Sequence, residues 1–112
     1  NTIFVTGVEG DINQSFRSSI YKSTNNGVSF SVAKELFGSS CERIKFWNNN
    51  LGIAIDNYTI GSSIVKTTDG GNTWTAYSSA IGAITSIHFP NSTGNVGYLM
   101  DISGSIYKTI NN

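Results

Sequence analysis

The feature that most constrains the fold of this chain is an internal repeat. The segment "IVKTTDGGNTW" at 64–74 has the same layout as "IYKSTNNGVSF" at 20–30, and "IYKTINN" begins it again at 106–112. The isoleucines that open the three copies are 44 and 42 residues apart. A period of this size indicates repeated supersecondary units, each of which buries its apolar face against the next.

The repeat extends to the residues that precede each copy. The segment "IKFWNNNLGIAID" at 44–56 matches "IHFPNSTGNVGYLMD" at 87–101, with two more residues in the second segment. The aligned pairs are Phe46 and Phe89, Asn48 and Asn91, Gly52 and Gly97, and Asp56 and Asp101. One unit therefore contains four strands, a number and period typical of a β-propeller blade.

Strand signals run along the whole chain. Apolar residues alternate with polar ones, β-branched and aromatic residues are frequent, and Gly or Asn clusters interrupt them at short intervals. The segment "SVAKELF" at 31–37 contains good helix formers, but we expect a strand there as well. The ten predicted strands are 2–8, 16–23, 29–36, 43–48, 51–56, 62–68, 73–78, 84–90, 95–101 and 105–110.

Composition narrows the class of partner. The 112 residues carry a net charge of zero, and only 12% are charged, so no basic patch is expected for nucleic acid or anionic lipid. No apolar run approaches the length of about 18 residues that a membrane helix needs. The single Cys41 excludes an intrachain disulfide and is expected to be buried in a strand. The Asn-, Ser- and Thr-rich polarity favours an extracellular or periplasmic location.

The polar turn inside each copy has a predictable chemistry. Asx side chains can accept backbone N–H bonds within the turn, glycine can supply a positive φ, a hydroxyl can bond across the loop, and an aromatic ring can cover it. In the second copy these residues are Asp69, Gly71, Thr67 and Trp74. In the first copy they are Asn25, Gly27, Ser23 and Phe30, and the third copy supplies Thr109 and Asn111.

This turn resembles the Asp-box, or BNR repeat, of sialidase-type and photosystem II assembly-factor-like β-propellers. With the strands of a blade named A to D, the resemblance implies an all-β propeller segment of about 2.5 four-stranded blades. Its strand order is BCD-ABCD-ABC, and its blade units are about 1–37, 43–78 and 84–112. These units form one partial propeller domain.

Three blades are too few to close a ring. The ring is therefore expected to be completed by other chains, for instance as a homodimer, or by the remainder of a larger propeller. Both arrangements remain open at this point.

The sialidase resemblance raises the question of catalysis. Those enzymes use three arginines, a Tyr–Glu pair and an Asp, whereas this chain has only Arg17 and Arg43. No motif places Tyr58, Tyr77 or Tyr98 beside Glu9, Glu35 or Glu42, and His88 is the only histidine. We therefore expect no catalytic residues, no bound metal and no cofactor.

The expected function is that of a non-catalytic binding or assembly module that presents inter-blade loops to a protein or carbohydrate. The candidate ligand face contains Trp47, Asp56, Tyr58 and Asp101, although the recurrence of the two aspartates also fits an architectural role. Trp47 can equally be packed between blades. One alternative is a fragment of a sialidase-type glycoside hydrolase whose catalytic blades are absent, and another is a structural subunit of a self-assembling ring or fibre.

Overall fold

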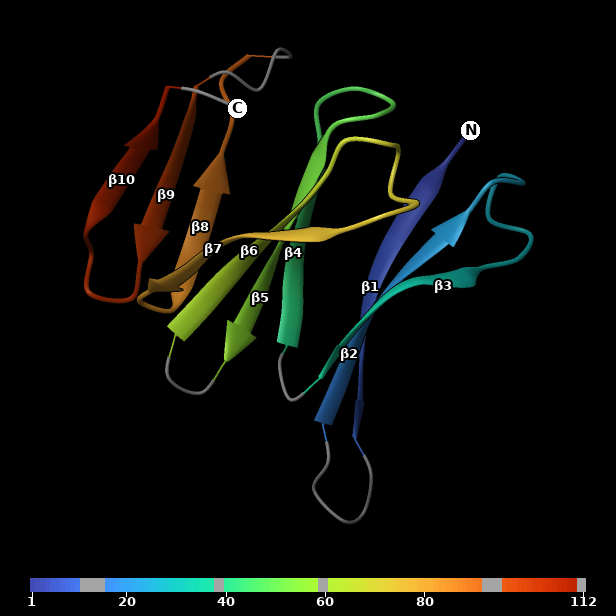
Figure 1. Ribbon diagram of the computed structural model, residues 1–112, viewed down its shortest axis with the longest axis horizontal. Coiled ribbons are helices and arrows are strands. Elements are labelled where there is room, and N and C mark those ends of the chain that lie inside the picture. Colours follow the sequence, from blue (N-terminus) through green and yellow to red (C-terminus); the bar gives the residue numbers. More distant parts are fainter. Residues whose placement is uncertain (11–15, 38–39, 59–60, 92–95, 111–112) are drawn as a thin grey trace.

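The computed structural model describes residues 1–10, 16–37, 40–58, 61–91 and 96–110 (Figure 1). Within these ranges the chain forms antiparallel strands and no helix, which confirms the predicted all-β class. The strands are β1 (Ile3–Gly10), β2 (Phe16–Ser23), β3 (Ser31–Phe37), β4 (Ser40–Phe46), β5 (Gly52–Tyr58), β6 (Gly61–Thr67), β7 (Thr75–Ile81), β8 (Ile84–His88), β9 (Gly97–Asp101) and β10 (Ile106–Thr109).

These strands make three open sheets, in which sequence neighbours pair. The first sheet is β1-β2-β3, the second is β4-β5-β6-β7, and the third is β8-β9-β10. Figure 1 shows the three sheets following one another across the molecule, from β1–β3 on the right to β8–β10 on the left. The molecule measures 36 × 35 × 18 Å.

Strand boundaries differ from the predicted ones for local reasons. Strand β4 begins three residues earlier than expected, because Ser40 and Cys41 pair with Asn57 and Asp56 of β5. Strand β7 begins later, at Thr75, because the residues before it belong to the polar turn. The segment with helix-forming residues is strand β3, as predicted.

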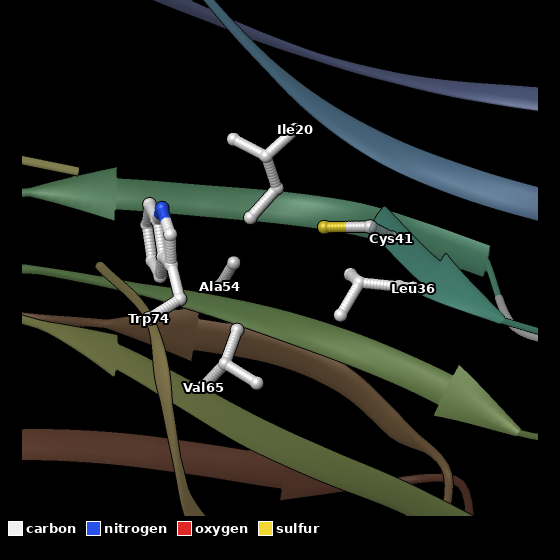
Figure 2. Close-up of a cluster of buried hydrophobic side chains, with 6 residues drawn as sticks. All are labelled: Ile20, Leu36, Cys41, Ala54, Val65 and Trp74. Carbon is white, nitrogen blue, oxygen red and sulfur yellow. The ribbon is translucent and has the colours of Figure 1, made fainter. Parts of the chain in front are cut away.

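The first and second sheets pack face to face through a buried apolar cluster. Figure 2 shows its six side chains converging from strands β2 to β6 and from the turn before β7: Ile20, Leu36, Cys41, Ala54, Val65 and Trp74. Two further aromatic rings extend the cluster. Phe4 of the first sheet stacks on Phe46 of the second at 4.2 Å between centroids, and both rings meet the edge of Trp74.

A second apolar cluster joins the second sheet to the third. Its buried members are Ile53, Ile55, Ile64 and Ile84, with Trp47, Ile87, Phe89 and Leu99 packed against them. A hydrogen bond from the Ile84 backbone N–H to the Ser62 hydroxyl, 2.8 Å long, links the same two sheets.

The second sheet is thus covered on both faces, and consecutive residues of its strands serve different clusters. Ala54 belongs to the cluster with the first sheet, whereas its neighbours Ile53 and Ile55 belong to the cluster with the third sheet. Alternation of this kind follows from the two-residue period of a strand. We call the face of a sheet that is turned toward the next sheet in the sequence its forward face, and the opposite face its backward face.

A glycine beneath a phenylalanine recurs in the second and third sheets. A Cβ atom on Gly52 would lie 2.7 Å from the Phe46 ring, and one on Gly97 would lie 2.5 Å from the Phe89 ring. Each ring therefore occupies the space above its glycine, and no larger residue fits there. This contact explains physically why both residues recur in the sequence alignment.

Candidate functional site

The polar turn between β6 and β7 is held by side-chain hydrogen bonds. The Thr67 hydroxyl accepts the Gly71 N–H at 2.8 Å and donates to Asp69 Oδ1 at 2.9 Å. Asp69 Oδ1 also accepts the backbone N–H groups of Asn72 and Thr73, at 3.0 and 2.9 Å. The Thr73 hydroxyl donates to Asp69 Oδ2 at 2.6 Å. Thr67 and Asp69 thus make the cross-loop and acceptor bonds expected from the sequence.

The turn between β2 and β3 has most of these bonds with different side chains, although the Val28 N–H donates to the Asn25 backbone carbonyl rather than to its side chain. The Ser23 hydroxyl accepts the Gly27 N–H and donates to Asn25 Oδ1, both at 2.9 Å. Asn25 Oδ1 accepts the Ser29 N–H at 3.0 Å, and Asn25 Nδ2 donates to the Ser29 hydroxyl at 2.8 Å. Only this last bond reverses direction, because an amide donates where the carboxylate of the second turn accepts.

Both turns need two successive residues with positive φ. In the first turn these are Asn26 (+60°) and Gly27 (+85°), and in the second Gly70 (+70°) and Gly71 (+78°). Asparagine tolerates this region better than most residues. At Gly71 packing adds a second constraint, because a Cβ atom there would lie 2.5 Å from the ring of Phe4.

Hydrogen bonding lowers the pKa of Asp69 from 3.8 to about 2. The Thr73 hydroxyl contributes most to this shift, followed by the Thr73 backbone N–H. Donors that point at a carboxylate favour its charged form. Asp69 is therefore an ionised acceptor engaged within its own turn, which is the property of a structural group rather than of a proton donor.

The aromatic residues that follow the two turns differ in burial. Trp74 is 7% exposed because it lies in the cluster between the first and second sheets. Phe30, its equivalent in the first turn, is 44% exposed, and its ring lies 4.0 Å from where a Cβ atom on Gly27 of the turn would be. Among the described residues, no sheet packs on the backward face of the first sheet. In the third copy, Thr109 ends β10, and Asn111 lies outside the described residues.

Asp101 organises the turn between β9 and β10. Its Oδ1 accepts the N–H groups of Ser103 and Ser105 at 2.9 Å and the Ser103 hydroxyl at 2.6 Å. Its Oδ2 accepts the Tyr107 hydroxyl at 3.0 Å. The Ser103 hydroxyl is the main cause that lowers the pKa of Asp101, and the bond to Asp101 raises the pKa of Tyr107. Asp101 therefore holds its own turn together through these bonds.

Asp56, the repeat equivalent of Asp101, has a different environment. It is 1% exposed, and neither carboxylate oxygen has a hydrogen-bond partner. Strand β5 continues past Asp56 to Tyr58, whereas β9 ends at Asp101. Asp56 instead lines a cleft of about 290 Å³ between the first and second sheets.

The cleft also contains a buried donor. Trp74 lines it, and its indole Nε1 is buried without a hydrogen-bond partner. Leu36, Val65 and Ala76 supply apolar lining, while Lys34, Glu35 and Ser63 supply polar groups. Sequence reasoning missed the cleft, because residues of β3 meet residues of β5 to β7 only after the sheets pack. The recurrence of Asp56 was the only signal that pointed toward it.

The other candidate residues do not converge on this cleft. Trp47 packs on Phe89 between the second and third sheets, with 4.8 Å between ring centroids. The side chain of Tyr58 lies outside the described part of the molecule. Arg17 and Arg43 are exposed on the first and second sheets, and His88 is exposed on the third.

Among the described residues, no group of three His, Cys, Asp or Glu side chains is placed to hold a metal ion. The same residues include no helix long and apolar enough to cross a membrane. Comparison with protein-family models, curated proteins and solved structures finds no match.

Proposed function

We propose that this chain is a non-catalytic carbohydrate-binding module built as a segment of an Asp-box β-propeller. In this proposal the three sheets are blades in the order BCD, ABCD and ABC. The shared hydrogen bonds of the two polar turns support the assignment, as does the packing of repeat-equivalent residues on successive sheets.

The observation that carries the binding function is the pair of unpartnered polar groups in one cleft. Asp56 offers two acceptor oxygens, and Trp74 Nε1 is a donor. Leaving such groups unpaired in the interior costs about 1–3 kcal/mol each. Sugar hydroxyls can meet these needs separately, because one O–H can donate to Asp56 and the oxygen of another can accept from Trp74 Nε1.

The other properties of the cleft favour a neutral sugar. Its volume of about 290 Å³ is at the lower end of small-molecule pockets, enough for one monosaccharide or the last residue of a glycan. Leu36, Val65 and Ala76 can contact the C–H face of a pyranose ring.

Other features argue against catalysis at a recurring carboxylate. Asp69 and Asp101 are engaged by donors from their own turns. Arg17 and Arg43 lie on different sheets, which does not suit a shared grip on a substrate carboxylate.

The experiment is a titration of the ¹⁵N-labelled protein with neutral monosaccharides, followed through the two indole N–H signals in NMR spectra. A sugar concentration of up to about 50 mM would saturate even a site with a Kd of about 1 mM. The Trp74 signal is expected to shift with saturation, whereas the Trp47 signal, from the opposite interface, stays in place and serves as an internal control.

Two variants locate the effect. Asp56→Asn is expected to weaken binding at least tenfold, while Glu9→Gln, which removes a carboxylate on the opposite face of the first sheet, leaves affinity unchanged. Equal shifts of both indole signals, no shift of Trp74, or unchanged affinity in Asp56→Asn would overturn the proposal.

A further inference from the structure

We infer that the forward face of the third sheet binds the backward face of the first sheet of a second copy of this chain, head to tail. This inference does not depend on the sugar cleft. It rests on the exposure of side chains whose repeat equivalents are buried between sheets.

The forward faces of the second and third sheets are equivalent but differ in exposure. In the second sheet, Ile53, Ile55 and Ile64 occupy this face and are at most 7% exposed. The repeat and the strand register make Tyr98, Met100 and Ile106 their counterparts in the third sheet. These counterparts are 38%, 41% and 72% exposed. The third sheet thus presents the apolar face that its neighbour buries.

The backward face of the first sheet is also exposed where its equivalent in the second sheet is buried. In the second sheet, Ala54, Val65 and Trp74 hold this face against the preceding sheet. Their counterparts in the first sheet are Val5, Tyr21 and Phe30, and Val32 lies opposite Tyr21 in the register. Val5, Phe30 and Val32 are all 44–51% exposed.

The chain itself indicates what covers these faces. At each of the two interfaces within the chain, the forward face of one sheet packs on the backward face of the next sheet. The two interfaces use repeat-equivalent positions. Each copy has one exposed face of each kind, so a second copy supplies the complementary surface by continuing the same packing. Such a contact joins two different surfaces and is therefore heterologous. Successive contacts form a closed ring or an open filament, depending on the angle between copies.

Charges at the two faces are compatible with this contact. The backward face of the first sheet carries Glu9, which accepts the Tyr21 hydroxyl at 2.8 Å, and also Glu35 and Arg17. The forward face of the third sheet carries Lys108, 5.9 Å from the Tyr98 ring centroid. A net negative face thus meets a positive one.

The test uses one blocked face in each of two variants. Ile106→Glu blocks the forward face and Val32→Glu blocks the backward face, and both sites are exposed in the single chain, so folding is preserved. By sedimentation velocity, the wild-type protein is expected to associate with rising concentration, and each variant alone is expected to be monomeric. An equimolar mixture is expected to form a 1:1 heterodimer, because each variant retains the face that the other needs.

Met100→Glu and Val5→Glu repeat the test from neighbouring strands and are expected to give the same pattern. A wild-type protein that stays monomeric up to about 1 mM would overturn the proposal. A variant that still self-associates, or a mixture that stays monomeric, would do so as well. Because both variants gain the same charge, attraction between the substituted sites cannot produce the heterodimer.

Discussion

At the scale of single residues, the polar turns explain which positions of the repeat are fixed and which vary. The acceptor position holds aspartate in one turn and asparagine in the other, since both offer an oxygen to the same backbone N–H. The hydroxyl position holds threonine or serine for the same reason. Positions 27 and 71 both hold glycine, because the residue there has a positive φ and its backbone N–H donates to the hydroxyl of Ser23 or Thr67.

Gly71→Ala tests the close packing of this position. We expect it to lower the free energy of unfolding by about 2–4 kcal/mol, because the added Cβ atom combines a left-handed backbone with a clash against Phe4. Gly104→Ala is the matched control, with φ +83° and no atom within 4 Å, and is expected to cost about 1 kcal/mol. Urea unfolding measures both values. Equal losses would show that the contact with Phe4 does not matter.

Asp69→Asn tests the electrostatic part of the turn. Folding lowers the pKa of Asp69 from 3.8 to about 2, so the unfolded chain binds the proton first and the contribution of Asp69 is lost as the pH falls between these values. The variant should keep the turn, because Asn25 serves the same role. Its unfolding free energy, measured in urea from pH 6 to pH 2, should decline less steeply than that of the wild type. Parallel curves would contradict this role of Asp69.

At the scale of strands and sheets, the sequence predicts most of the strand positions and their order. Alternation and turn chemistry place all ten strands, and residues 31–37 form a strand although Ala33, Lys34, Glu35 and Leu36 favour helix, because the sheet environment overrides local propensity. The cleft was not predictable, since Asp56 and Asp101 align in sequence although β5 continues past Asp56 and β9 ends at Asp101. Asp101 is bonded within its own turn, whereas both carboxylate oxygens of Asp56 are without a partner.

The packing of the sheets can be tested at one repeat position. Ile64 and Ile106 are equivalent in sequence, but only Ile64 lies between two sheets. Ile64→Ala should destabilise the fold by about 2–5 kcal/mol, as large-to-small changes in a core do. Ile106→Ala should change the stability of the single chain by at most about 0.5 kcal/mol. Thermal and urea unfolding at low protein concentration would measure both, and similar losses would contradict the assigned faces.

At the scale of the whole molecule, the described part of the chain is an open stack in which only the second sheet is covered on both faces. The stability of the stack therefore depends on two interfaces between repeats, as in other proteins whose units contact only their neighbours. In the head-to-tail contact that we propose, further copies bind the two end faces, whereas the Asp56 cleft lies at an internal interface. Assembly and ligand binding would then use different surfaces of one repeated unit.

The most direct test of this stacking is a nuclear Overhauser spectrum of the aromatic rings. The account predicts cross-peaks between Phe4 and Phe46, whose ring centroids are 4.2 Å apart, and between Trp47 and Phe89, at 4.8 Å. These pairs report the first and the second interface separately. Cross-peaks between Phe4 and Phe89, or the absence of both predicted pairs, would show that the sheets do not follow one another face to face.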